Sequence, residues 1–183
     1  MLKKQLLLIT MLLTLVNCAT NTVEGPKTPP AVTPVEKTDL VKVLSTKGFT
    51  EKEKVKLNNY IPKMNETIDS ECFKTFMVNR NIHTTQNKSN AEVVKHLRTS
   101  QVEIHLITYY KRWSKVHGYT YPNVNKIWLN RKYHAGASLC SEASNLAHEL
   151  SHKLGYTHDF KATQRRPFSV PYSINAGFTA CCK

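Results

Sequence analysis

The sequence predicts an α+β fold for residues 41–183. Apolar side chains recur at helical spacing over residues 64–77 and 141–154, whereas residues 102–110 alternate as a half-buried strand does. The length of 183 residues fits one domain. An apolar content of 40% with only six glycines excludes a wholly disordered or collagen-like chain.

Residues 1–17 have the features of a signal peptide. Lys3 and Lys4 precede the apolar run Leu6–Val16, which is too short to cross a bilayer as a helix. We therefore expect the protein to be exported.

The end of this apolar run indicates a lipid anchor. Its sequence, Leu15-Val16-Asn17-Cys18, resembles the lipobox of bacterial lipoproteins, in which the cysteine is lipidated and becomes the mature N-terminus. Asn17 stands where that pattern has Ala, Gly or Ser, so an ordinary signal peptide is the alternative. With a lipid on Cys18, the Pro- and Thr-rich residues 18–40 would tether the domain to a membrane, facing the periplasm or the cell exterior.

Capping and turn signals place the secondary structure of the domain. Thr50 and Glu53 form a capping box that starts a helix, which Pro62 either interrupts or divides in two. The other expected elements are a helix at 90–98, strands at 102–110 and 126–130 with a turn-rich segment at 114–125 between them, and a helix at 141–154 that Gly155 ends.

The last of these helices carries residues that can bind a metal. His148 and His152 are four apart, so both imidazoles lie on one helical face and Glu149 lies beside them, near the position of a metal-bound water. Gly155 allows a positive φ that turns the chain sharply and returns His158 as a third ligand. Three neutral imidazoles and a water form an open zinc site.

The pattern HExxHxxGxxH in His148–His158 resembles that of the metzincin zinc metallopeptidases. The resemblance implies a small metzincin-like zincin, with a twisted sheet, an active-site helix and a short C-terminal subdomain. It also implies a zinc-dependent endopeptidase that cleaves proteins or peptides outside the cytoplasm, with Glu149 as the general base. A helix with incidental histidines would leave Gly155 and His158 without a role.

The match to metzincins has one departure. These enzymes have a Ser-x-Met-x-Tyr turn beneath the zinc, and no Met follows Met77 in this chain. The nearest segment, Ser169–Tyr172, has Val170 or Pro171 where the Met would be. Tyr172 is then a catalytic candidate that donates to the oxyanion or contacts the zinc, or alternatively a wall of the specificity pocket.

Two further roles follow from the same resemblance. Asp159 would orient a ligand or anchor the chain near the site, with a plain surface carboxylate as the alternative. Residues 126–130 would form the edge strand that pairs with an extended substrate, with an inner strand as the alternative.

The cysteines predict a crosslinked C-terminus. Apart from Cys18, the chain has Cys72, Cys140, Cys181 and Cys182. A bond between the adjacent pair would close a strained ring, so we expect Cys72 and Cys140 each to bond one of the two C-terminal cysteines. Free buried thiols, or a Cys72 that blocks the zinc, are the alternatives.

The net charge and the remaining histidines say little about the function. A net charge of +13 favours anionic partners, but no nucleic-acid-binding motif accompanies it, so we expect no nucleic acid, a membrane contact through Cys18, and a monomer. His134 is only a weak site candidate. A non-enzymatic, zinc-stabilised envelope-binding module and a zinc amidohydrolase on cell-wall peptides are the alternative functions. Glu149 argues against the first, because a structural zinc site usually has four protein ligands and needs no base.

Overall fold

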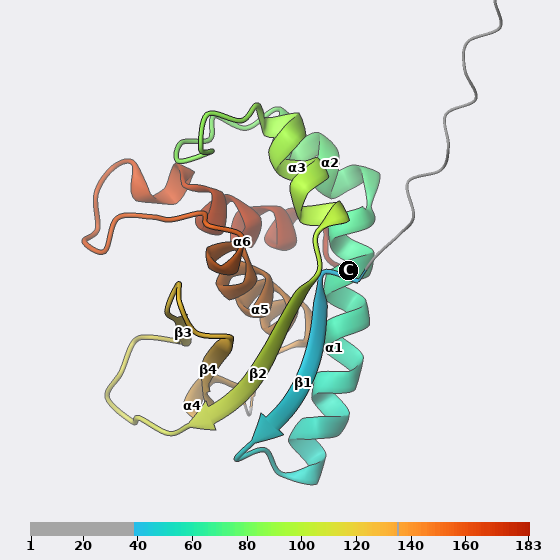
Figure 1. The fold of residues 1–183 in the computed structure, drawn as a ribbon, viewed down its shortest axis with the longest axis vertical. Coiled ribbons are helices and arrows are strands. Elements are labelled where there is room, and N and C mark those ends of the chain that lie inside the picture. The colour runs from blue at the N-terminus through green and yellow to red at the C-terminus, as the bar shows by residue number, and fades with distance from the viewer. Residues whose placement is uncertain (1–38, 135) are drawn as a thin grey trace, which may run out of the picture. The chain divides into compact units, whose positions relative to one another are not determined.

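The computed structural model describes residues 39–134 and 136–183 (Figure 1). In chain order the elements are β1 (Val41–Lys47), α1 (Glu51–Asp69), α2 (Glu71–Val78), α3 (Asn90–Thr99), β2 (Val102–Tyr109), β3 (Gly118–Thr120), β4 (Lys126–Asn130), α4 (Arg131–His134), α5 (Leu139–Lys153), the 3₁₀ turn η1 (Arg166–Phe168) and α6 (Val170–Cys181). The expected signal peptide, Cys18 and most of the tether lie outside these residues. None of the helices described is long and apolar enough to cross a membrane.

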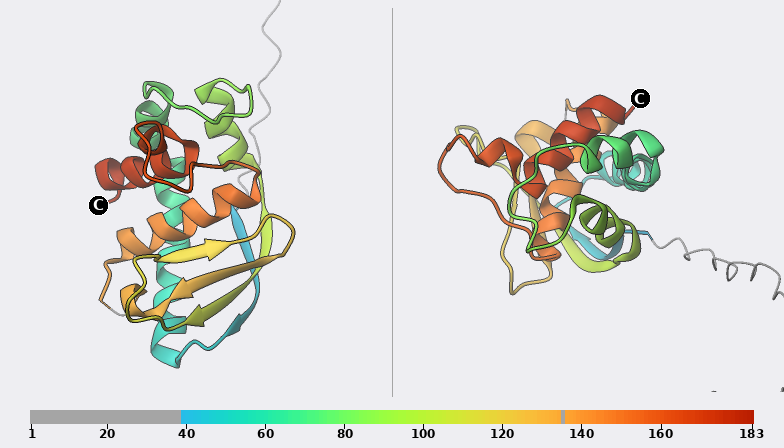
Figure 2. Two further views of the ribbon diagram at one scale, coloured as in Figure 1. Left: turned by 90° about the vertical axis from the view of Figure 1, so that its left-hand side faces the viewer. Right: turned by 90° about the horizontal axis from the view of Figure 1, so that it is seen from above.

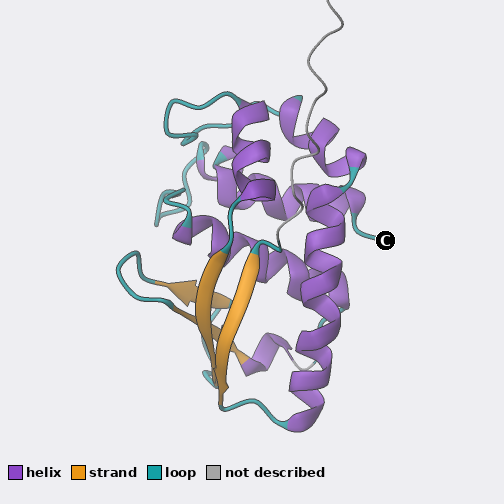
Figure 3. Cartoon of the chain, turned by 45° about the vertical axis from the view of Figure 1, so that its right-hand side comes forward, coloured by secondary structure: helices purple, strands orange, loops and turns teal. Residues whose placement is uncertain are grey.

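The four strands form one mixed sheet in the order β1-β2-β4-β3. β1, β2 and β4 are parallel, and β3 is antiparallel to β4. The helices α1 and α5 lie on the same face of the sheet (Figures 2 and 3). Alternate residues of the two central strands are fully or almost fully buried, namely Ile104, Leu106, Ile127 and Leu129. The predicted α+β class is therefore confirmed.

The expected edge strand is not an edge. Residues 126–130 form β4, which lies between β2 and β3. The edge on this side of the sheet is β3, whose three residues lie within the segment that we expected to be turn-rich. Tyr119 of β3 stacks on Trp128 of β4, with ring centroids 5.0 Å apart, and this contact stabilises the short strand. Three residues are too few to show the alternating pattern that predicts a strand.

Pro62 neither interrupts nor divides the first long helix, because α1 runs through it from Glu51 to Asp69. A proline leaves the carbonyl four residues earlier without its helical hydrogen bond, and here both Pro62 and Asn58 are exposed, so water can satisfy that carbonyl. The helix ends instead at Ser70. The Ser70 hydroxyl donates to Thr67 O and accepts from Phe73 N at the start of α2.

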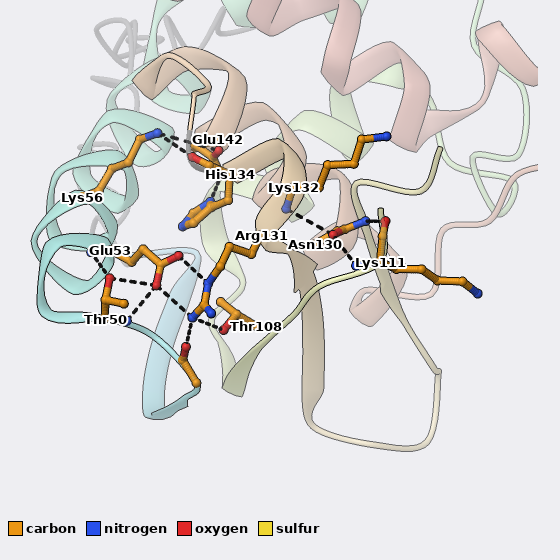
Figure 4. A network of polar contacts seen from close by, with 11 residues as sticks. Thr50, Glu53, Lys56, Thr108, Lys111, Asn130, Arg131, Lys132, His134 and Glu142 are labelled. Atoms are coloured by element: carbon orange, nitrogen blue, oxygen red, sulfur yellow. Dashed lines mark hydrogen bonds and ion pairs between the residues drawn. The ribbon is translucent and has the colours of Figure 1, made fainter. Parts of the chain in front are cut away.

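A polar network joins the start of α1 to the sheet (Figure 4). Arg131 follows β4 and donates to Glu53 Oε1 at 2.8 Å and Oε2 at 3.1 Å. Burial alone would raise the pKa of Glu53. The hydrogen bonds from the Thr50 N–H and the Arg131 guanidinium outweigh burial, so the pKa is lowered. Lys56, one turn further along α1, donates to the carbonyls of His134 and Ala137 and so holds the segment that leads into α5.

The C-terminal residues form a helix rather than a turn. Ser169–Tyr172, the segment compared with the methionine turn, begins α6, and Val170 and Pro171 are buried in its first turn. Two disulfides, Cys72–Cys181 and Cys140–Cys182, bond the end of this helix to α2 and to α5. The predicted bonding of the C-terminal cysteines is therefore confirmed. All four cysteines among the described residues are in disulfides, so Cys72 is not available to block a metal.

Candidate metal centre

Three histidines converge at the C-terminal end of α5. His148, His152 and His158 each offer a ring nitrogen, and these atoms lie within 4.8 Å of one another. The ring centroids are 4.9 to 5.3 Å apart. These are the three residues that the sequence predicts as metal ligands.

The local backbone explains how His158 reaches the other two. Ser138 caps the start of α5 by accepting from Ser141 N, so the helix begins slightly earlier than expected. Gly155 then has φ of +89°, a conformation that side chains disfavour, and the chain turns back after it. The Tyr156 N–H donates to Ser151 O at 3.1 Å and fixes that turn.

Two of the histidines are oriented by main-chain carbonyls. Nδ1 of His152 lies 2.7 Å from Tyr156 O, and Nδ1 of His158 lies 3.0 Å from Asp159 O. A carbonyl oxygen can only accept, so in both rings Nδ1 carries the hydrogen and Nε2 keeps its lone pair. This arrangement prepares the Nε2 atoms for a metal ion.

The third histidine faces α6, where both the Pro171 carbonyl and the Asn175 side chain contact its ring. The Asn175 amide on α6 lies 3.1 Å from Nδ1 of His148 and is itself bonded by the Ser144 hydroxyl at 3.0 Å. A 180° turn of the amide would present its oxygen to an Nδ1–H, as metal binding through Nε2 of His148 requires. Asn175 therefore belongs to the site.

The electrostatics keep the histidines neutral. Burial, reinforced by His152 and His158, lowers the pKa of His148 to about 3. Burial also lowers the pKa of His152 and that of His158. Metal ligands must be unprotonated, so three neutral imidazoles with oriented rings fit a divalent metal ion.

Glu149 shares a cleft with the three histidines. The cleft has a volume of about 990 Å³, and its lining includes residues of β3, α5 and α6. Burial raises the pKa of Glu149 to about 8, and the positive charge of Lys153 opposes this rise. A Cβ atom on Gly118 of β3 would lie 3.3 Å from Glu149 Cγ, so the edge strand passes directly beside the carboxylate.

Of the remaining site candidates, Tyr172 lies in the cleft, whereas the side chains of Asp159 and His134 have other partners. Tyr172 lines the cleft, and its ring centroid lies 5.1 Å from that of His148 and 5.0 Å from that of His158. The Asp159 carboxylate accepts from the Thr163 hydroxyl, so it anchors the following loop. His134 is buried away from the three histidines, with Nδ1 bonded to the Glu142 carboxylate.

Sequence reasoning missed several contributors to the site. Asn175 and Gly118 have no local signal, because each acts through contact with α5 from a distant element. The Tyr156 carbonyl is a main-chain group, so residue identity does not reveal it.

No protein-family model, curated protein or solved structure matches this chain.

Proposed function

We propose that this protein is a zinc-dependent endopeptidase that cleaves proteins or peptides outside the cytoplasm. The observation that carries the proposal is the convergence of three neutral histidines beside a buried glutamate in an open cleft. Together with the spacing from His148 to His158, it supports a metzincin-like enzyme.

Zinc is the metal that best suits the donor set. Three imidazoles without a thiolate or a carboxylate are a ligand set of catalytic zinc sites, which leave a fourth position open. When bound, zinc would lower the pKa of water toward neutrality and polarise the carbonyl of the scissile bond.

The residues of the chain would supply the proton transfers and hold the substrate. Glu149 accepts a proton from the attacking water and passes it to the nitrogen of the leaving amine. Tyr172 lines the same cleft. Its phenol would donate to the oxygen on which negative charge develops. The free edge of β3 would pair with the backbone of an extended peptide, a role expected at first for residues 126–130.

The openness of the site favours catalysis over a structural role. A structural zinc is usually closed by a fourth protein ligand, whereas the cleft here leaves room for a substrate beside the histidines. The two disulfides are compatible with an oxidising, extracytoplasmic compartment. A lipid on Cys18 and a monomeric state complete the proposal.

Metal analysis combined with hydrolysis tests this function. Residues 19–183, produced under oxidising conditions, should bind about one zinc per chain and cleave an unfolded protein. Removal of the metal by a chelator should abolish cleavage, and added zinc should restore it. Cleavage that survives complete removal of metal would contradict the proposal.

A further inference from the structure

Arg166 occupies a fixed position next to the candidate metal centre. It begins η1, between the loop that carries His158 and the start of α6. Its backbone N–H lies 3.2 Å from Thr163 Oγ1, and its carbonyl accepts from the Ser169 hydroxyl at 2.8 Å. Because Thr163 also donates to Asp159, the loop that carries Arg166 is closed by hydrogen bonds at both ends.

The guanidinium of Arg166 lies over Tyr172. Its Cζ is 4.8 Å from the centroid of the Tyr172 ring, which in turn contacts the rings of His148 and His158. The positive charge of Arg166 is therefore separated from the histidines by one side chain, that of Tyr172. Arg166 lines the same cleft as the histidines.

Most of the hydrogen-bonding capacity of this guanidinium is unused. Nη1 donates to Phe160 O at 3.3 Å, while Nε is buried and has no partner within residues 39–134 and 136–183. An arginine has five N–H donors, and a buried donor without a partner is costly. The other N–H groups of the guanidinium can donate to an acceptor that enters the cleft with a ligand.

The charge of the cleft indicates the kind of acceptor. Among the described residues that line it are the cations Lys115 and Arg166, and the one carboxylate among them belongs to Glu149, which the proposed mechanism already uses as a base. A planar guanidinium binds a carboxylate through two parallel hydrogen bonds, which fix orientation as well as charge.

We propose that Arg166 is a specificity residue that binds a substrate carboxylate next to the scissile bond. This inference rests on the proposed peptidase function and names its substrate class as acidic peptides. The carboxylate belongs either to an Asp or Glu side chain or to the C-terminus of a short peptide. In both cases the chemistry of recognition at Arg166 is the same.

Matched peptides distinguish the two sources. One pair differs by Glu or Gln beside the cleaved bond, and the other by a free or an amidated C-terminus. The wild-type protein should prefer the charged member of one pair by on the order of 10- to 100-fold in kcat/KM, the range expected of a charge-assisted hydrogen bond. Arg166→Gln should remove most of this preference.

Arg165→Gln is the matched control, since Arg165 is exposed, lies outside the cleft lining and carries the same charge. It should keep the wild-type preference. Equal rates for both members of both pairs in the wild-type protein would overturn the inference, and so would a preference that Arg166→Gln leaves unchanged. The first of these outcomes does not depend on how well the variant folds.

Binding provides a readout that does not require hydrolysis. Fluorescence anisotropy with the same peptides and metal-free protein should give the same discrimination between charged and neutral members, lost in Arg166→Gln and kept in Arg165→Gln. Equal affinities would overturn the role of Arg166. If the wild-type protein cleaved nothing, the peptidase function would fail and this binding comparison alone would decide the inference.

Discussion

Asn175 on α6 lies 3.1 Å from Nδ1 of His148 on α5. The C-terminal helix thus orients a histidine of the candidate metal centre, and the disulfides that fix the end of α6 also fix that contact. The metal centre and the crosslinked C-terminus are therefore one structural unit.

Asn175→Ala should weaken zinc binding. Loss of a residue that orients a metal-bound histidine typically costs 10- to 100-fold in affinity, and about that loss is expected here. Thr179→Ala is the control, because Thr179 is exposed on the same helix and, within the described residues, its side chain bonds only to the Asn175 carbonyl. Competition with a chelating dye measures both affinities. Equal affinities in the two variants would show that Asn175 does not orient His148.

Gly155→Ala should disturb both the fold and the metal centre. Its φ of +89° is unfavourable for alanine, so we expect a loss of about 1–2 kcal/mol in the free energy of unfolding. The return of the chain toward His158 should shift as well, which lowers zinc affinity. His158→Ala, which removes that ligand, should lower it further. Denaturant unfolding and zinc titration provide the two measurements, and wild-type values for both in Gly155→Ala would refute this account of the turn.

Gly118→Ala should reduce hydrolysis while the metal stays bound. The added methyl would meet Glu149 Cγ at 3.3 Å and the Trp128 carbonyl at 3.2 Å, so either β3 or the carboxylate must move. A displacement of this kind should lower kcat/KM by about 10-fold. Gly136→Ala is the control, because a Cβ there has no atom within 4 Å. If Gly118→Ala matched this control, the edge strand would not constrain Glu149.

Loss of the Cys140–Cys182 bond should destabilise the domain and loosen the cleft. A double Cys→Ser variant should lose about 2–4 kcal/mol in the free energy of unfolding. Because both cysteines line the cleft at the end of α6, zinc affinity should fall with it. Denaturant unfolding and dye competition measure the two effects, with Cys72–Cys181 intact as shown by non-reducing peptide mapping. Unchanged stability would contradict a structural role for this bond.

Features encoded by neighbouring residues could be predicted from the sequence. The His148–His158 motif depends on helical spacing and on one positive φ at Gly155, so its three histidines were placed together correctly. The capping box at Thr50 and the buried face of β2 are local in the same sense.

Features that depend on distant contacts could not be predicted. β1 and β3 were missed because only pairing with β2 and β4 makes them strands. Pro62 carries a local signal for a helix break, but exposure of the freed carbonyl removes its cost. Because residues 169–172 were interpreted as a turn, the start of α6 was not predicted, and neither was the position of Asn175 on that helix.

The most direct test of the central claim is the hydrolysis of an unfolded protein by Glu149→Gln after its zinc content has been measured. Glu149 is assigned as a base and not as a ligand, so the variant should bind about one zinc per chain while its rate falls by about 10²- to 10⁴-fold. Wild-type hydrolysis by the zinc-loaded variant would contradict the account.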